Sequence, residues 1–245
     1  MKKVMEKVME KFENLEKKLK IFFKNKKFLI EAFCHRSFLN ENPNFPCSSN
    51  ERLEFLGDAV LELITTEYLF KFFPEKPEGE LTKIRASLVN SKILSEVAKK
   101  LGFEEFLLLS KGEQKSQGKA RERILANTFE SFLGALYLEF GLDFCKKFLK
   151  KNLLYLLPEI LEKRMFEDPK TKFQELIQEK FKITPSYKVL EEFGPDHDKT
   201  FIVGLYLGEN LIAKGKGSSK QEAEEEAAKK ALEMEEKGLL NQIII

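Results

Sequence analysis

The pattern of hydrophobic and polar positions divides the chain into two parts. Up to Leu157, apolar residues recur at intervals of three and four, as in amphipathic helices, without a convincing strand alternation. The pattern then changes, and the expected elements are helix Pro169–Phe181, strands Ser186–Glu192, Thr200–Leu207 and Leu211–Gly215, and helix Gln221–Glu236. The predicted fold is multidomain: an all-α domain over 1–157, a linker over 158–167, an α+β (α-β-β-β-α) domain over 168–237 and a tail over 238–245.

One predicted helix, from Asn50 as its N-cap to about Phe73, carries acids along one side. At about 100° per residue, four carboxylates fall within roughly 80° of one another. They are Glu51, Glu54, Asp58 and Glu62. Like charges four residues apart destabilise a helix, so this stripe favours a counter-charge such as Mg²⁺ or Mn²⁺. A solvated acidic face explains the spacing alone equally well.

A second acid-bearing helix is predicted over Ile124–Tyr137, where Asn127 and Glu130 share one side. The small residues Gly134 and Ala135 favour close approach of another helix. The preceding stretch, 110–123, is predicted to be a polar loop near an anionic substrate.

Further predictions concern the rest of the helical part. Met1–Leu39 is expected to be helical, and Glu41–Ser49 is expected to be a loop. Phe144–Leu157 is predicted to be one helix stopped by Pro158. For His35-Arg36-Ser37, packing or capping is the favoured role, and a place beside the substrate is the alternative.

Composition narrows the class of protein. With 42% hydrophobic and 33% charged residues among 245, the chain resembles an ordinary soluble globular protein. No apolar run approaches the roughly 18 residues of a membrane span, so a cytoplasmic protein without a membrane partner is expected. The 3 cysteines contain no C-x-x-C pair, which favours reduced thiols. The 2 histidines lack metal-ligand spacing, so histidine-centred hydrolysis is poorly supported.

The segment Glu51-Arg52-Leu53-Glu54-Phe55-Leu56-Gly57-Asp58-Ala59 resembles the signature of ribonuclease III, a family of double-stranded-RNA endonucleases. The resemblance continues through 78–86 and 124–137. The α-β-β-β-α unit resembles a double-stranded-RNA-binding domain, marked by Gly194-Pro195-Asp196-His197 and Gly215-Lys216-Gly217-Ser218-Ser219-Lys220. Because the resemblance covers nearly the whole chain in the bacterial domain order, it favours metal binding over a solvated face for the acidic stripe.

The resemblance implies a homodimer that uses Mg²⁺, or Mn²⁺ as a substitute, and no organic cofactor. It implies cleavage of double-stranded RNA to 5′-phosphate and 3′-hydroxyl products, in the processing of ribosomal RNA precursors and other RNAs. The positions that match the metal cluster are Glu54, Asp58, Asn127 and Glu130. Asp58 and Glu130 match the most critical catalytic carboxylates. Glu51 and Glu78 match further acids that line the valley in which the family binds the RNA duplex, and Phe55 matches a residue that inserts into the partner subunit.

In the C-terminal domain, the resemblance implies three groups of RNA contacts. They are Thr171, Gln174 and Glu175 on the first helix, Pro195 and His197 in the first turn, and Lys216, Ser218, Ser219 and Lys220 before the last helix. Residues 168–237 hold 12 Lys or Arg and 15 Asp or Glu, a net of −3 that leaves +5 for the rest of a chain of net charge +2. Because Gln221 and Glu222 follow Lys220, the basic cluster is thin, and modest affinity with a shallow salt dependence is expected. Glu222–Glu226 is expected to be a solvated face.

One position departs from the family pattern. Asn127 stands where the family usually has Asp, so one negative charge is missing although an amide oxygen remains. We favour a natural, active variant with weaker metal affinity over an engineered Asp→Asn change. Two rival functions stay open: a non-cleaving regulator that binds double-stranded RNA, and an all-α metal-dependent nucleotide pyrophosphohydrolase, against which the RNA-binding domain argues.

Overall fold

The computed structural model describes residues 2–162, 164, 166, 168–195 and 199–240. The chain divides into two compact units, Met1–Phe166 and Glu167–Ile245. The first is built from helices and the second from helices and a sheet, so the predicted fold class is confirmed.

Helices form the regular structure of the first unit, and only an isolated bridge, Cys34 to Leu108, is strand-like among its described residues. The α-helices are α1 Lys2–Leu19, α2 Lys26–Ala32, α3 Arg36–Glu41, α4 Glu51–Phe72, α5 Glu78–Leu88, α6 Ser91–Lys100, α7 Gly118–Phe140, α8 Leu142–Asn152 and α9 Leu157–Glu162. Short 3₁₀ turns are η1 Phe103–Phe106, η2 Glu113–Lys115 and η3 Leu154–Leu156.

Several boundaries differ from the prediction. The single helix expected over Phe144–Leu157 is wrong: α8 ends at Asn152, and Pro158 lies in the first turn of α9, where proline has no hydrogen bond to lose. The expected linker, 158–167, is therefore helical at its start, and Ile160 is buried in the first unit. The expected polar loop, 110–123, ends early because α7 already begins at Gly118.

Two further expectations near the N-terminus need correction. The predicted helical stretch Met1–Leu39 is interrupted twice, between α1 and α2 and again before α3. Asn50 stands at the N-cap position of α4, but its backbone is helical and its side chain makes no capping hydrogen bond. Asn50 is instead buried, and its backbone N–H donates to the Cys34 carbonyl at 2.9 Å.

Phenylalanine rings fill the centre of the first unit. Phe132 of α7 lies 4.9 Å from Phe103 and 5.9 Å from Phe33 between ring centroids, and Phe33 lies 5.0 Å from Phe103. All three rings are fully buried, and each contributes on the order of 3 kcal/mol through burial of its apolar surface. This aromatic core holds α7 in the middle of the unit.

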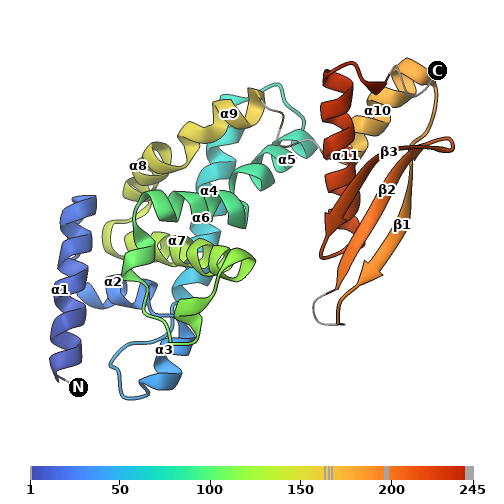
Figure 1. Cartoon of the computed structure of the whole chain (residues 1–245). Coiled ribbons are helices and arrows are strands. Elements are labelled where there is room, and N and C mark those ends of the chain that lie inside the picture. Colours follow the sequence, from blue (N-terminus) through green and yellow to red (C-terminus); the bar gives the residue numbers. More distant parts are fainter. Residues whose placement is uncertain (1, 163, 165, 167, 196–198, 241–245) are drawn as a thin grey trace. The chain divides into compact units, whose positions relative to one another are not determined.

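On α7, glycine permits direct backbone contact with α4, which it crosses (Figure 1). A Cβ atom on Gly134 would stand 2.3 Å from the Leu53 carbonyl oxygen, and one on Gly57 would stand 1.8 Å from the Glu130 carbonyl oxygen. No real Cβ tolerates such distances, so the two backbones touch. The close approach predicted at Gly134 is confirmed, and it brings the two acid-bearing helices together.

The second unit has the predicted element order. Its elements are α10 Pro169–Phe181, β1 Ser186–Phe193, β2 Thr200–Leu207, β3 Asn210–Gly217 and α11 Lys220–Glu236. The strands form an antiparallel sheet in the order β1-β2-β3, and both helices cover one face of it (Figure 1). Ala223 and Ala227 of α11 are fully buried, and a Cβ on Gly215 would stand 1.9 Å from the Ala223 carbonyl oxygen. Small residues thus let α11 lie directly on β3.

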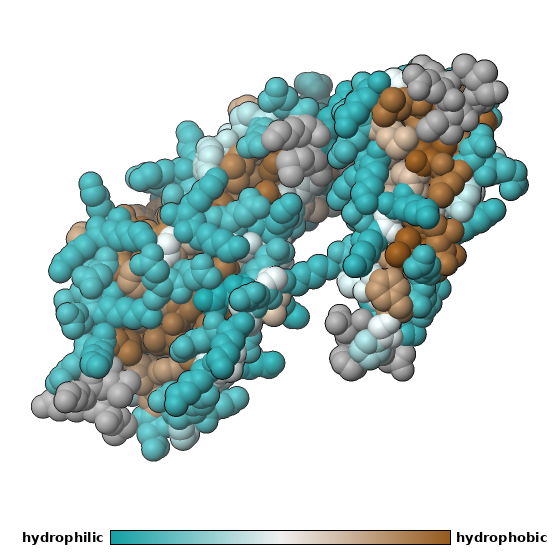
Figure 2. Space-filling view, viewed as in Figure 1, coloured by the Kyte–Doolittle hydropathy of each residue, from teal (hydrophilic) through white to brown (hydrophobic). Residues whose placement is uncertain are grey.

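Figure 2 shows that hydrophilic residues cover much of the visible face of each unit, with hydrophobic residues exposed between them. Within the described part of the chain, no helix combines the length and the apolar character needed to cross a membrane.

The α4–α7 contact leads to a prediction for Gly134→Ala. The added methyl group would force the two backbones apart, and we expect a loss of at least about 2 kcal/mol in the free energy of unfolding, measured by urea denaturation. Gly79→Ala is the control because nothing lies within 4 Å of its Cβ, and an alanine in α5 should stabilise by up to about 1 kcal/mol. Equal stability of Gly134→Ala and the parental chain would contradict the contact.

Candidate active site

Three acids interact where α4 meets α7. The pKa of Glu130 rises to about 8 because the carboxyl group is buried and because Asp58 and Glu54 add negative charge beside it. Burial also raises the pKa of Glu54, against a hydrogen bond from Asn127 and the positive charge of Arg123. Glu54, Asp58 and Glu130 are thus close enough for their charges to act on one another, and Asn127 lies beside Glu54.

Asn127 takes part in this cluster through its side-chain hydrogen bond to Glu54. Since a carboxylate only accepts, the amide N–H donates in this bond. The same amide could turn its oxygen towards a cation, because amide oxygens are ordinary ligands of hard divalent metals. Asn127 thus removes a charge from the cluster and adds a donor to it.

The donors suit a hard divalent cation. All are oxygen ligands, and a buried carboxyl group such as Glu130 is most readily ionised when a cation lies beside it. Among the residues that the structure describes, no group of three or more His, Cys, Asp or Glu is drawn together at metal-ligand spacing.

The remaining acids of the prediction have different surroundings. Glu51 accepts a hydrogen bond from the Ser49 hydroxyl at 2.8 Å, and one of its oxygens lies 3.6 Å from Nη1 of Arg36. Glu62, the last acid of the stripe, is paired with Nε of Arg85 at 2.9 Å, so its counter-charge comes from α5. Glu78 begins α5 and accepts from the Thr82 hydroxyl at 2.9 Å. Glu78 lines a separate cavity of about 490 Å³ rather than the acid cluster of its own chain.

His35 caps α3, in agreement with the favoured expectation. Its Nδ1 accepts from the backbone N–H of Ser37 at 3.3 Å and lies 2.8 Å from the Ser37 hydroxyl oxygen. That hydroxyl accepts from the backbone N–H of Ser110 at 3.1 Å, so its own proton points to Nδ1. His35 also lines a cavity of about 420 Å³ that includes Glu54 and Asn127. Capping and a place beside the acids therefore coexist.

Phe55 lies on α4 with 82% of its surface exposed. Beside it is a cavity of about 590 Å³ lined partly by Phe28, Leu56 and Leu138. A large exposed aromatic side chain next to an apolar hollow is typical of a protein–protein contact.

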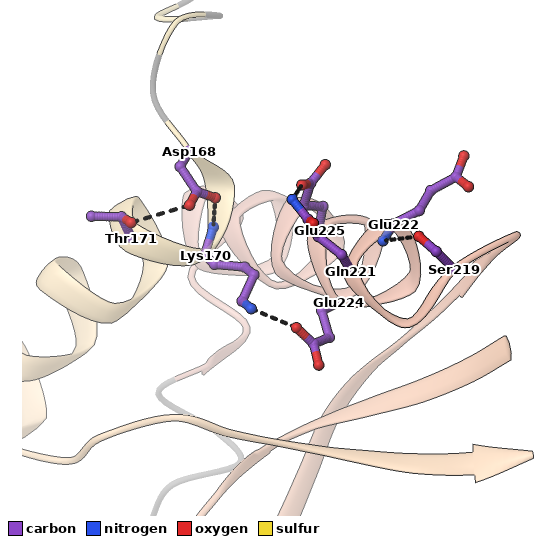
Figure 3. A network of polar contacts seen from close by, with 8 residues as sticks. All are labelled: Asp168, Lys170, Thr171, Ser219, Gln221, Glu222, Glu224 and Glu225. Carbon is purple, nitrogen blue, oxygen red and sulfur yellow. Dashed lines mark hydrogen bonds and ion pairs between the residues drawn. The ribbon is translucent and has the colours of Figure 1, made fainter. Parts of the chain in front are cut away.

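In the second unit, the predicted RNA contacts are exposed at the surface. Thr171, Gln174 and Glu175 stand three and four residues apart on α10, so they share one face. Pro195, Lys216, Ser218, Ser219 and Lys220 are also exposed, whereas His197 lies outside the described residues. Figure 3 shows Asp168 accepting from Thr171, and Lys170 of α10 reaching Glu224 of α11.

The expectation that Glu222–Glu226 is a solvated face is wrong. Glu222 accepts hydrogen bonds from the backbone N–H and the hydroxyl of Ser218, at 2.9 and 2.6 Å. Glu226 accepts from the backbone N–H of Lys216 and pairs with Lys230. The sequence concealed these contacts because they join the end of β3 to the first turns of α11.

Known proteins share both units. A model of the Ribonuclease-III-like family matches residues 25–157, and one of the double-stranded RNA binding motif matches 169–234. Ribonuclease 3 of a Nitratiruptor species is 45% identical over 226 residues, which are 92% of this chain and 97% of that protein. The chain belongs to the ribonuclease III family. It is an endoribonuclease that acts on double-stranded RNA.

Other members support the assignment. Ribonuclease 3 of Borreliella burgdorferi is 45% identical over 214 residues, which are 87% of each chain. The solved nuclease domain of ribonuclease III from Campylobacter jejuni is 41% identical to this chain, with a TM-score of 0.53. The alignment covers 59% of this chain and 96% of that domain. That nuclease domain is described as structurally flexible in a region involved in dimer formation.

Sequence reasoning missed two features of this ribonuclease III family member. The charge of Arg123 acts on Glu54, but Arg123 lies in the stretch 110–123, which the sequence predicts to be a loop. Sequence reasoning placed Gly57 in the motif without a reason, although Gly57 is as necessary as Gly134 for the helix contact.

Glu130 leads to a prediction about pH. Its pKa is raised from 4.5 to about 8, so between these values the folded chain holds a proton that the unfolded chain releases. Stability therefore falls as pH rises through this window. In EDTA, the free energy of unfolding of Glu130→Gln should rise relative to that of the parental chain between pH 5 and pH 8. The rise should be at most about 1.4 kcal/mol for each pH unit. Glu13→Gln, at an exposed site on α1, is the control for the loss of one charge. If the difference in free energy of unfolding between Glu130→Gln and the parental chain did not change with pH, the raised pKa of Glu130 would be refuted.

Glu222 leads to a prediction about RNA affinity. Its carboxylate occupies donors of Ser218 that a phosphate would use, so Glu222→Gln should bind duplex RNA roughly fivefold more tightly. Glu225→Gln removes the same charge from α11 without touching Ser218, because Glu225 accepts from Gln221. If both variants gain equally in a filter-binding assay, net charge alone is responsible and competition at Ser218 is excluded.

Proposed function

We propose that this endoribonuclease cleaves duplex RNA with Mg²⁺, or Mn²⁺ in its place, leaving 5′-phosphate and 3′-hydroxyl ends. The observation that carries the proposal is the half-buried Glu130 beside Asp58 and Glu54, with the positive charge of Arg123 acting on Glu54. Glu54, Asp58, Asn127 and Glu130 would hold the cation. When bound, such a cation activates water and neutralises charge on the scissile phosphate and the leaving oxygen.

The residues of the chain supply position rather than acid–base chemistry. Asp58 and Glu130 come from helices whose backbones touch, so their separation is fixed before RNA arrives. His35 has its Nδ1 engaged in capping, and no histidine is needed as a general base when the water is activated by a metal. The hydrogen bond from Asn127 holds Glu54 in place.

The second unit would grip the duplex. The face of α10 with Thr171, Gln174 and Glu175 would contact one minor groove, the turn with Pro195 and His197 would reach the next, and Lys216, Ser218, Ser219 and Lys220 would bind the phosphates between them. Ser219 caps α11 by accepting from the Glu222 backbone N–H at 3.2 Å. The helix dipole would attract a phosphate here, and that phosphate would have to displace the Glu222 carboxylate from Ser218. Precursors of ribosomal RNA, with long helical stems, are the substrates we propose.

Assembly would be a homodimer with Phe55 in its interface. The exposed ring of one chain would enter the apolar hollow of the other, and the reverse, as a two-fold interface requires. In the dimer, Glu78 of one chain could approach the valley of the other, which fits its place outside the cluster of its own chain.

The second candidate function is a regulator that binds duplex RNA without cutting it. Asn127 favours it, because the site has one carboxylate fewer than the family pattern. Glu54, Asp58 and Glu130 still provide three acids, so we favour cleavage.

A cleavage assay tests the proposed function. Duplex RNA incubated with the protein and Mg²⁺ should give short duplex products, and Glu130→Gln should slow cleavage at least about 100-fold while still binding RNA. Asn127→Asp should lower the Mg²⁺ concentration for half-maximal cleavage, because it adds a charged ligand. An intact, shifted RNA band with the parental chain would establish the regulator instead; an unchanged Mg²⁺ requirement would remove Asn127 from the site.

Phe55→Ser tests the dimer. Loss of a buried aromatic anchor should weaken association by roughly 2 kcal/mol or more, seen as monomer in sedimentation velocity at a concentration where the parental chain is dimeric. Phe22→Ser removes another exposed phenylalanine, outside the hollow beside Phe55, and should leave assembly unchanged. A monomeric parental chain at all concentrations would disprove the proposed assembly.

A further inference from the structure

The cavity beside the acid cluster contains basic groups as well as acids. Its volume is about 420 Å³, and Arg36 and Arg123 line it together with Glu51, Glu54 and Asn127. The two arginines come from different helices, Arg36 from the first residue of α3 and Arg123 from α7. RNA phosphates are repelled by bare carboxylates, so guanidinium groups at this place need an explanation.

The position of Arg123 suits contact with a ligand. Arg123 stands four residues before Asn127, so both lie on the same side of α7. Its charge acts on Glu54, yet the side chain is exposed. A guanidinium group has five donors and can bind a phosphate through two of them at once.

Arg36 is held only loosely within the protein. Its Nη1 lies 3.6 Å from a Glu51 oxygen, and 72% of its side chain is exposed. An exposed pair at this distance contributes little to stability, so Arg36 can exchange Glu51 for another anion at small cost.

His35 adds a neutral donor to the same cavity. Its Nδ1 accepts from the backbone N–H of Ser37, which places the ring proton on Nε2. The ring is fixed by this cap, and His35 lines the cavity together with both arginines.

We infer that Arg36 and Arg123, with the Nε2–H of His35, form a binding site for a phosphate of the RNA backbone. This phosphate is the neighbour, on the same strand, of the phosphate at which the RNA is cut. The inference rests on the proposed function, since it takes the neighbouring acids as the cleavage site. Metal ions between the carboxylates would neutralise the scissile phosphate only. The arginines would bind the next phosphate and so set the register of the strand over the acids.

The test compares RNA binding and cleavage by full-length variants. In EDTA, where cleavage is blocked, Arg123→Gln and Arg36→Gln should each bind a duplex of about 30 base pairs roughly fivefold more weakly. Each should also flatten the slope of log K against log salt by about one, the value for one lost phosphate contact. The matched variants Arg123→Lys and Arg36→Lys should keep most of the slope of log K against log salt, because lysine keeps the positive charge. Lys150→Gln, at an exposed site on α8, controls for net charge.

Cleavage supplies the second readout. In Mg²⁺, both Gln variants should raise KM about fivefold. Arg123→Gln should also change kcat, because the charge of Arg123 acts on Glu54, whereas Arg36→Gln should act mainly on KM. An unchanged RNA affinity and salt slope, with an altered Mg²⁺ requirement, would overturn the inference and leave Arg123 as an internal counter-charge of Glu54. If the parental chain does not cleave RNA, the proposed function fails, whereas the binding comparison in EDTA still decides whether the arginines contact phosphate.

Discussion

The contact between the backbones of α4 and α7 determines the rest of the nuclease unit. At Gly57 and Gly134 the helices are as close as main chains can be, and any side chain would separate them. Acids that are about 70 positions apart in the sequence meet only because of this contact. Its support comes from the other side of α7, where Phe132 and Phe129 are buried in the aromatic core. Apolar packing on one face thus enforces repulsion on the other.

That repulsion is offset in three ways. Glu130 keeps its proton to about pH 8, Asn127 replaces a charge by a hydrogen-bond donor, and Arg123 lies near Glu54. Each lowers the cost of gathering acids before a cation arrives. The cluster would still offer oxygen ligands to the proposed cation.

Local periodicity predicted the architecture well. Alternation predicted the strands of the second unit, and the bounds of α10 agree with those expected because Pro169 and Phe181 mark its ends in the sequence. Local periodicity failed for segments that are held in place by residues distant in the sequence. The first turns of α7 carry no core residue before Ile124, so they look like a loop, and Arg121 there is instead paired with Glu104 of η1. The partners of Glu222 and Glu226, like the cavity shared by His35 and Arg123, depend on tertiary structure that a linear pattern does not contain.

The carboxylate of Glu222 at Ser218 has a consequence for selectivity. The donors before α11 already have an internal anion, so a small ligand with one phosphate gains little by displacing it. A duplex that made the proposed contacts with α10, the first turn and the start of α11 together would gain more than the displacement of Glu222 costs. An anion site that is occupied in this way would favour duplexes over nucleotides and short single strands, because these smaller ligands make fewer contacts with which to displace Glu222.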